Sequence, residues 1–388
     1  MKFNPRTKEA GLIRFENKIT HETVIKSGLL LFAIALNTIE LFIPRIPFFP
    51  WLKPGLANII TIVWIIRYSF IDSLLFITLR VWILSFYFGF SFITFTLGYS
   101  GAICACCAMT ICWNIFGKKK ILGTIGIAII GAAFHNAGQL LAVYFLMAKN
   151  THLFYQTPLM LFASVLFGGI VGFLVPVLIN IITEISYKKY DYKIKIPESN
   201  TIIIPHIFIS ILLLFLCISL IFISNTSFLF ITAVSITLYV QYLVKGSIST
   251  LLLPLRRFWL MFIFIGILHS FFTYGIRVYP FFPVTYEGIH KTLILWIKVW
   301  TWIQTSTVFI YYKFHIFLFR GLQKLFSQYR STLLAGLLAA EYFPAVIDLI
   351  RSDSKKILQM FFIRPRYILY EIYSSIINLI ITQQEDKL

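Results

Sequence analysis

The feature that most constrains this chain is a series of apolar blocks, most of them roughly 17–25 residues long, that recur along its length. A helical block of this length matches the hydrocarbon thickness of a lipid bilayer. The composition agrees, because 59% of the residues are hydrophobic and only 13% are charged, about half the charged share that is usual for a soluble globular protein. We therefore predict an all-α, polytopic integral membrane protein.

The blocks fall into two halves. Those of the first half cover residues 27–43, 55–66, 70–88, 90–113, 121–147 and 158–183, and those of the second half cover 202–223, 228–244, 251–272 and 292–311. All the first-half blocks are long enough to cross a bilayer except 55–66, which is predicted to be tilted, short or re-entrant. A polar stretch with one proline separates the halves. The predicted organisation is an N-terminal cytoplasmic segment (1–26), a six-helix membrane domain (27–185), a cytoplasmic linker (186–200) and a second membrane and coupling region (201–388).

The net charge of +19 arises from 34 Lys and Arg against 15 Asp and Glu. These basic residues lie in short connectors, such as 118–120 and 188–195, which a cytoplasmic N-terminus would place on the cytoplasmic side. Such a pattern favours loops facing anionic membrane lipids and argues against nucleic-acid binding. We expect a multi-pass protein of the bacterial inner membrane, without a cleaved signal peptide and with its five cysteines packed rather than disulfide-bonded.

Polar residues within apolar blocks are candidates for a ligand site, because they are costly in a membrane unless they are paired or functional. Glu40 ends the first block before two prolines, and Asn58 opens the second. They could line the rim of a substrate pocket, or Glu40 could simply pair with Arg45 or Lys53 and close the loop.

Two further groups lie deeper in their blocks. Arg80 and Asp72 share one face of a predicted helix, as an ion pair or as part of a functional site. His135, Asn136 and Gln139 lie among glycines and alanines, with His135 and Gln139 one helical turn apart. This last group favours ligand binding or gating over a simple interhelical hydrogen bond.

The motifs of several enzyme classes are absent from the sequence. It contains neither the glycine-rich loop that holds a nucleotide nor the His-Glu-x-x-His of a zinc protease, and its Asp residues are isolated rather than gathered for magnesium diphosphate. We therefore predict no enzymatic activity of its own, no catalytic residue, no bound metal and no cofactor.

The first half resembles a known membrane family. The runs Leu36–Pro44, Pro54–Ile59, Leu79–Val81 and Ala133–Leu140 are similar to the family called heptaprenyl diphosphate synthase component I, or Gx transporters. That family in turn resembles the six-helix substrate-binding S components of energy-coupling factor (ECF) vitamin importers. The resemblance implies a small vitamin-like substrate, with a flavin-related compound suggested by the family association.

The second half resembles, more weakly, the transmembrane T component of the same importers. The similarity covers 251–256, 269–275, Val284–Gly288 and Leu338–Pro344, and in that family a Thr-x-Glu-Gly turn precedes a spanning helix while a Phe-Pro segment opens cytoplasmic coupling helices. The Ala-Arg-Gly motifs that dock such helices onto ATPases are absent here. After Pro344, Arg351, Arg364 and Arg366 could stand in for these motifs. The residues expected to contact soluble ABC-type ATPases are Arg320, Lys324, Arg330, Glu341, Pro344 and Arg351.

Two functions follow from these resemblances. The leading one is a fused membrane subunit of an ECF-type importer. The alternative is a membrane subunit of isoprenoid or quinone metabolism, or of flavin-based electron transfer, that does not transport. The missing Ala-Arg-Gly motifs also allow a third function, that of a non-transporting scaffold whose second half has lost coupling to ATPases. The sequence also leaves open whether the last helical run crosses the membrane.

Overall fold

The computed structural model describes residues 21–42, 55–88, 92–145, 151–186, 225–247, 273–311 and 326–385, together with scattered positions within 209–223, 251–271 and 322–323. Within these residues the chain is almost entirely helical and has a single two-stranded antiparallel sheet. Seven of the described helices are long and apolar enough to cross a membrane. The predicted all-α, polytopic membrane fold is therefore confirmed.

The predicted blocks of the first half correspond to helices. These are α1 (His21–Phe42), α2 (Ala57–Arg67), α3 (Phe70–Phe88), α4 (Phe92–Cys112), α5 (Thr124–Val143) and α6 (Thr157–Ser186). A π-helical turn (Trp113–Gly117) follows α4, and a 3₁₀ turn (Thr151–Gln156) precedes α6. Helix α2 has only 11 residues, about 16 Å of helix, and is too short to span a bilayer.

The second half contributes fewer described elements. They are α8 (Thr226–Val244), the strands β1 (Arg277–Tyr279) and β2 (Phe282–Thr285), α11 (Tyr286–Tyr311), a 3₁₀ turn (Ser327–Tyr329), α13 (Arg330–Ile363) and α14 (Pro365–Glu385). Helices α8 and α11 cover two of the predicted blocks. The other two, 202–223 and 251–272, are described only at scattered positions.

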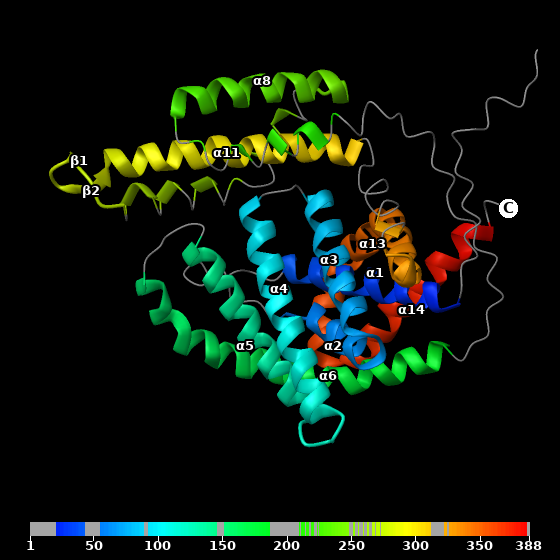
Figure 1. Ribbon diagram of the computed structural model, residues 1–388. Coiled ribbons are helices and arrows are strands. Elements are labelled where there is room, and N and C mark those ends of the chain that lie inside the picture. The colour runs from blue at the N-terminus through cyan, green and yellow to red at the C-terminus, as the bar shows by residue number, and fades with distance from the viewer. Residues whose placement is uncertain are drawn as a thin grey trace, which may run out of the picture.

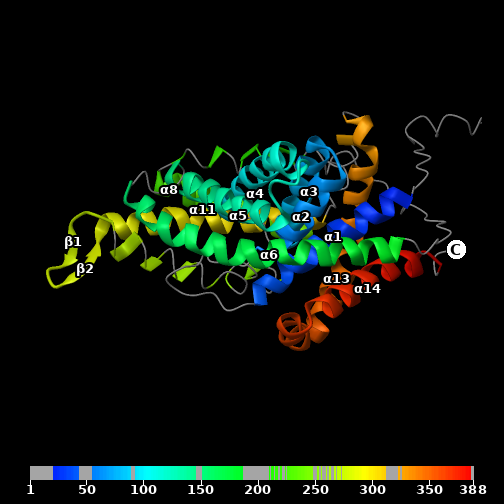
Figure 2. The same cartoon turned by 90° about the horizontal axis from the view of Figure 1, so that it is seen from below.

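Helix α1 lies inside the main helical body and contacts α2, α3, α13 and α14 (Figures 1 and 2). Of its apolar span, 83% is buried within the protein, as expected for a helix that is apolar on all sides. Side chains of α13 and α14 belong to the same hydrophobic cluster as those of α1, α2, α3 and α6. The two ends of the chain therefore share one core.

Helices α8 and α11 lie side by side across the ends of α3 and α4 (Figure 1). Two polar contacts join them, since Gln241 Nε2 donates to Gln304 Oε1 (3.1 Å) and Trp300 Nε1 donates to Thr237 Oγ1 (3.1 Å). Gln304 Nε2 also donates to the carbonyl of Leu251, which lies beyond α8 (2.8 Å). Helix α11 covers the predicted block 292–311 but is not among the seven candidate spans, and it contains polar residues such as Gln304. Interhelical hydrogen bonds of this kind stabilise helix pairs in membranes.

Two prolines lie inside long helices, and in both cases a hydroxyl from another helix binds the carbonyl that the proline leaves unpaired. A helical proline has no N–H to donate to the carbonyl four residues earlier. For Pro344 in α13 that carbonyl belongs to Ala340, and it accepts a 2.7 Å hydrogen bond from the Tyr87 hydroxyl of α3. For Pro176 in α6 it belongs to Gly172, and it accepts from Thr124 Oγ1 of α5 (3.0 Å). Both helices continue through their prolines because neighbouring helices supply the missing donor.

This arrangement predicts the effect of removing the Tyr87 hydroxyl. The substitution Tyr87→Phe leaves the Ala340 carbonyl without that donor and is expected to lower the free energy of unfolding by about 1–3 kcal/mol. In the Pro344→Ala background an N–H is available to Ala340 again, so Tyr87→Phe should cost much less there. Thermal unfolding of the four proteins in one detergent measures the difference. Equal costs in both backgrounds would contradict this account of the proline.

Candidate functional site

The loop before α2 is tied to the end of α1 by a carboxylate. Glu40 is 8% exposed, and its side chain accepts a hydrogen bond from the backbone N–H of Leu56. Gly55, just before it, has a φ of +69°, a left-handed conformation that favours glycine. The predicted partners Arg45 and Lys53 lie outside the described residues. Glu40 thus fixes where α2 begins.

Arg80 lies within α3 and is only 4% exposed. Its Nη1 donates to the Ala57 carbonyl (3.2 Å) and to Thr61 Oγ1 (3.1 Å) of α2, and Glu40 interacts with it electrostatically. We call Glu40, Leu56, Ala57, Thr61 and Arg80 the Arg80 cluster. It joins three helices through a buried positive and a buried negative charge.

The predicted pairing of Arg80 with Asp72 is wrong. Eight residues along a helix span about 12 Å, so two side chains on one face at that spacing do not meet directly. Asp72 instead accepts a hydrogen bond from Thr332 Oγ1 (2.5 Å) and lies 3.6 Å from Lys26 Nζ. The two residues therefore belong to separate polar groups on α3.

The Arg80 cluster leaves two polar groups available. Among the described residues, Arg80 Nε is buried and has no hydrogen-bond partner, and the half-buried side chain of Asn58 makes no hydrogen bond. Asn58 directly follows Ala57, whose carbonyl Arg80 binds. A guanidinium N–H and an amide at this place can donate to a carboxylate, phosphate or carbonyl oxygen of a small molecule.

The structure splits the third predicted group between two faces of α5. Gln139 Nε2 lies 3.1 Å from His135 Nε2, as their one-turn spacing predicted, and both lie against Gly101 of α4. Asn136 instead faces α6, where its amide donates to Ser164 Oγ (2.9 Å) and to the Met160 carbonyl (3.3 Å). Asn136 thus makes an interhelical hydrogen bond, whereas His135 and Gln139 form a pair beside a glycine that allows close approach.

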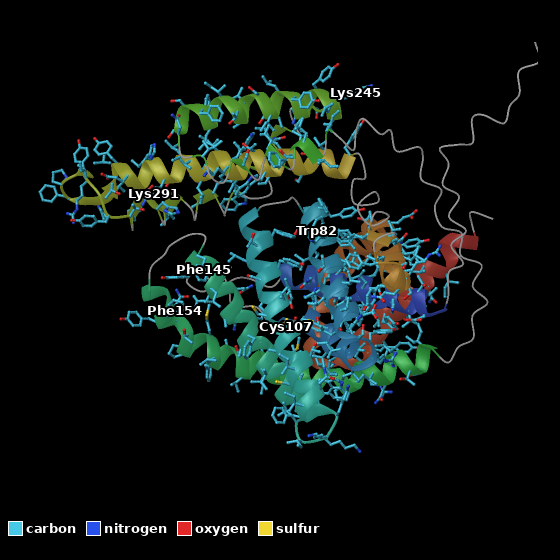
Figure 3. All side chains as sticks on the ribbon, in the orientation of Figure 1. Trp82, Cys107, Phe145, Phe154, Lys245 and Lys291 are labelled. Atoms are coloured by element: carbon cyan, nitrogen blue, oxygen red, sulfur yellow. The ribbon has the colours of Figure 1, made fainter. Side chains whose placement is uncertain are left out.

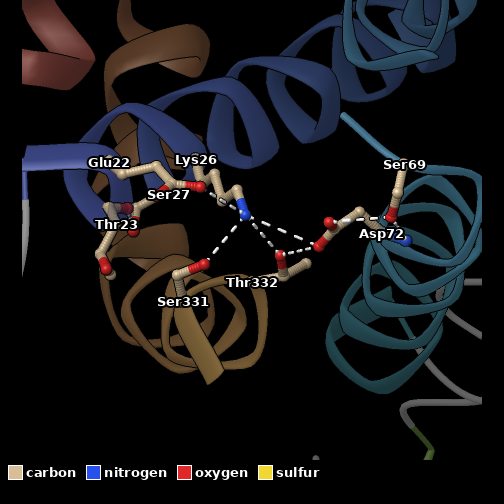
Figure 4. A network of polar contacts seen from close by, with 8 residues as sticks. All are labelled: Glu22, Thr23, Lys26, Ser27, Ser69, Asp72, Ser331 and Thr332. Atoms are coloured by element: carbon tan, nitrogen blue, oxygen red, sulfur yellow. Dashed lines mark hydrogen bonds and ion pairs between the residues drawn. The ribbon is translucent and has the colours of Figure 1, made fainter. Parts of the chain in front are cut away.

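A buried ion network that the sequence reasoning missed joins the two ends of the chain (Figure 4). Lys26 of α1 is 2% exposed. Its Nζ lies 2.9 Å from the Glu22 carboxylate and donates to Ser331 Oγ (2.9 Å) and Thr332 Oγ1 (3.0 Å) of α13. With Asp72 of α3, these residues are called the Lys26 network. In the sequence, Lys26 is visible as a charged residue at the edge of an apolar block. Its partner Thr332 lies 306 positions away and could not be predicted from that pattern.

The aromatic ring of Tyr68 covers one side of this network. Lys26 Nζ lies 4.6 Å from the ring centroid, a cation–π contact. Burial, helped by the negative charge of Glu22, raises the pKa of Tyr68 to about 12. The phenol therefore stays neutral at physiological pH.

The residues predicted to contact ATPases are only partly described. Arg320 and Lys324 lie outside the described residues, and Arg351 lies in α13 without a described side chain. Arg330, Glu341 and Pro344 are exposed on α13. The expectation that the Phe-Pro segment opens a helix is wrong, because Pro344 lies inside α13 and the Tyr87 hydroxyl compensates for its missing N–H.

Comparison with known families supports the first-half resemblance. Residues 29–178 match the family model "Heptaprenyl diphosphate synthase component I", which covers less than half of the chain but includes the helices of the Arg80 cluster. No curated protein and no solved structure matches the chain significantly. Within the described residues, no group of three or more His, Cys, Asp or Glu side chains could hold a metal ion. Residues 29–178 are therefore similar to heptaprenyl diphosphate synthase component I, and they form part of a multi-pass membrane protein.

Proposed function

We propose that this chain is the membrane subunit of an ECF-type importer of the bacterial inner membrane. In this proposal α1–α6 capture a small, vitamin-like metabolite, for which a flavin-related compound is the first candidate. The second half acts as a scaffold, and soluble ABC-type ATPases that bind it supply the energy. The chain itself catalyses no reaction.

The observation that carries this proposal is the Arg80 cluster. A buried guanidinium in an apolar helix is costly, and intramembrane charges usually serve a substrate or ion pathway. Here the charge lies in the segment that matches the family, and Arg80 Nε and the Asn58 amide are free to donate among the described residues. A small molecule with an anionic or carbonyl oxygen fits these donors.

The test is affinity purification of the tagged protein in mild detergent, followed by mass spectrometry of co-purifying proteins and of extracted small molecules. We expect ABC-type ATPases and one vitamin-like compound. The Arg80→Lys variant keeps the charge but loses the planar fork of donors. It should retain about ten- to a hundredfold less of the compound, because one charge-assisted hydrogen bond contributes roughly 1.5–3 kcal/mol.

The matched control is Arg67→Lys, which makes the same change at an exposed residue of the neighbouring helix α2. It should retain the compound like the unmodified protein. Equal retention by both variants would exclude Arg80 from the site. Recovery of a prenyltransferase or a redox partner with a lipid, and of no ATPase, would instead support the alternative suggested by the family's name.

A further inference from the structure

A β-hairpin projects from the N-terminal end of α11, at one edge of the molecule (Figure 1). Its strands β1 and β2 pair Arg277 with Thr285 and Tyr279 with Phe282, so Pro280 and Phe281 form the turn at its tip. The Pro280 carbonyl accepts a hydrogen bond from Arg277 Nη1 (3.2 Å). The hairpin is thus a short, closed unit that extends away from the helices.

The hairpin is fixed to α11 by the residues that start this helix. Glu287 Oε2 accepts a hydrogen bond from the backbone N–H of Ile276 (2.7 Å). Thr285 Oγ1 donates to the Thr273 carbonyl (2.9 Å) and accepts from the backbone N–H of Gly288 (3.1 Å), which caps the helix. The orientation of the tip is therefore determined by the direction of α11.

The side chains around this hairpin are aromatic and unusually exposed. Tyr274 is 100% exposed and Phe281 98%, and Ile276, Tyr279 and Tyr286 are also exposed. Val278, Tyr279, Phe281 and Val284 line a shallow, wholly apolar hollow on the hairpin. We call these residues, from Tyr274 to Tyr286, the aromatic tip. Exposed apolar surface that is rigidly held marks an interaction site.

The charge around the aromatic tip identifies its partner. Glu287 is the sole acidic residue between Glu198 and Glu341, and its carboxylate binds the Ile276 N–H. Arg277 on the hairpin and Lys291, one turn further along α11 (Figure 3), are basic. Aromatic residues with basic neighbours are typical of segments that lie at the interface between lipid headgroups and acyl chains.

We propose that the aromatic tip is an interfacial anchor, which inserts Phe281 and Tyr279 among the acyl chains of the bilayer while Arg277 and Lys291 contact anionic headgroups. Helix α11 has 26 residues, about 39 Å of helix, so a tip held at the membrane surface fixes one end of a long helix. The anchor would fix the depth and tilt of the α8–α11 pair. This inference does not depend on the proposed transport function.

The test attaches a nitroxide label to Phe281→Cys in the full-length protein, reconstituted in vesicles of phosphatidylethanolamine and phosphatidylglycerol. Collision of the label with oxygen, which partitions into lipid, is compared with collision with a water-soluble nickel complex. Two further sites are references: Lys119→Cys in the exposed 118–120 turn for water, and Phe173→Cys on the exposed face of α6 for lipid. The unsubstituted protein shows the background from native cysteines.

We expect an oxygen-to-nickel ratio for Phe281→Cys several-fold above that of Lys119→Cys and close to that of Phe173→Cys. Neutral phosphatidylcholine vesicles, or Arg277→Gln with Lys291→Gln, should shift it toward the water value. A ratio equal to that of Lys119→Cys would overturn the proposal. Dipolar broadening between nitroxides at position 281 on two chains, without accessibility to oxygen in the lipid, would also overturn it. That result would show that the tip contacts a second copy of the chain.

Discussion

The substitution Lys26→Met is expected to lower the free energy of unfolding by about 3–5 kcal/mol, the usual cost of removing one partner of a buried ion pair. Methionine keeps the apolar stem of lysine but leaves the largely buried Asp72 carboxylate without its positive partner. It also removes the donor to Ser331 and Thr332. Thermal unfolding in one detergent measures the loss of stability. The contact of α13 with α1 and α3 should weaken as well.

Two comparisons make this result specific. Lys119→Met makes the same chemical change at an exposed position, where surface substitutions change stability by about 0.5 kcal/mol or less. Lys26→Met combined with Asp72→Asn removes both charges and should be more stable than Lys26→Met alone. If Lys26→Met is as stable as Lys119→Met, the Lys26 network does not hold α13 to α1 and α3.

The sequence was sufficient for the helices because their cause is local. The block 70–88 coincides with α3, and 158–183 lies within α6, since runs of apolar residues of this length must be helical in a bilayer. The β-hairpin lies between the predicted blocks 251–272 and 292–311, where no strand was predicted. Its strands have three and four residues, and Pro283 lies within the second, so the alternation that indicates a strand is too short to see.

The candidate site could be predicted in part for the same reason. The contact between His135 and Gln139 follows from helical spacing alone, and it was predicted. The partners of Arg80 lie about twenty positions away in α2, and those of Lys26 include Thr332 at the other end of the chain. Tertiary packing selects such pairs, and no local periodicity encodes them. The polar residues were visible in the sequence, but their partners were not.

The substitution Arg80→Met is the second change with a large expected effect, and it separates a structural role of the Arg80 cluster from a binding role. Without the guanidinium, the Ala57 carbonyl and Thr61 Oγ1 lose their donor and the buried Glu40 carboxylate loses the positive charge with which it interacts, which is expected to cost about 1–3 kcal/mol of unfolding free energy. Arg67→Met, at an exposed residue of α2, is the control. An unchanged stability of Arg80→Met would show that Glu40 does not depend on Arg80.

Combining Arg80→Met with Glu40→Gln removes both buried charges at once. Glutamine keeps an oxygen that can accept from the Leu56 N–H, so most of the lost stability should return, as measured by thermal unfolding in one detergent. The folded double variant should nevertheless retain no metabolite, because the guanidinium is absent. If it retains the same compound as the unmodified protein, the Arg80 cluster serves only to join α1, α2 and α3, and the substrate site lies elsewhere in the segment.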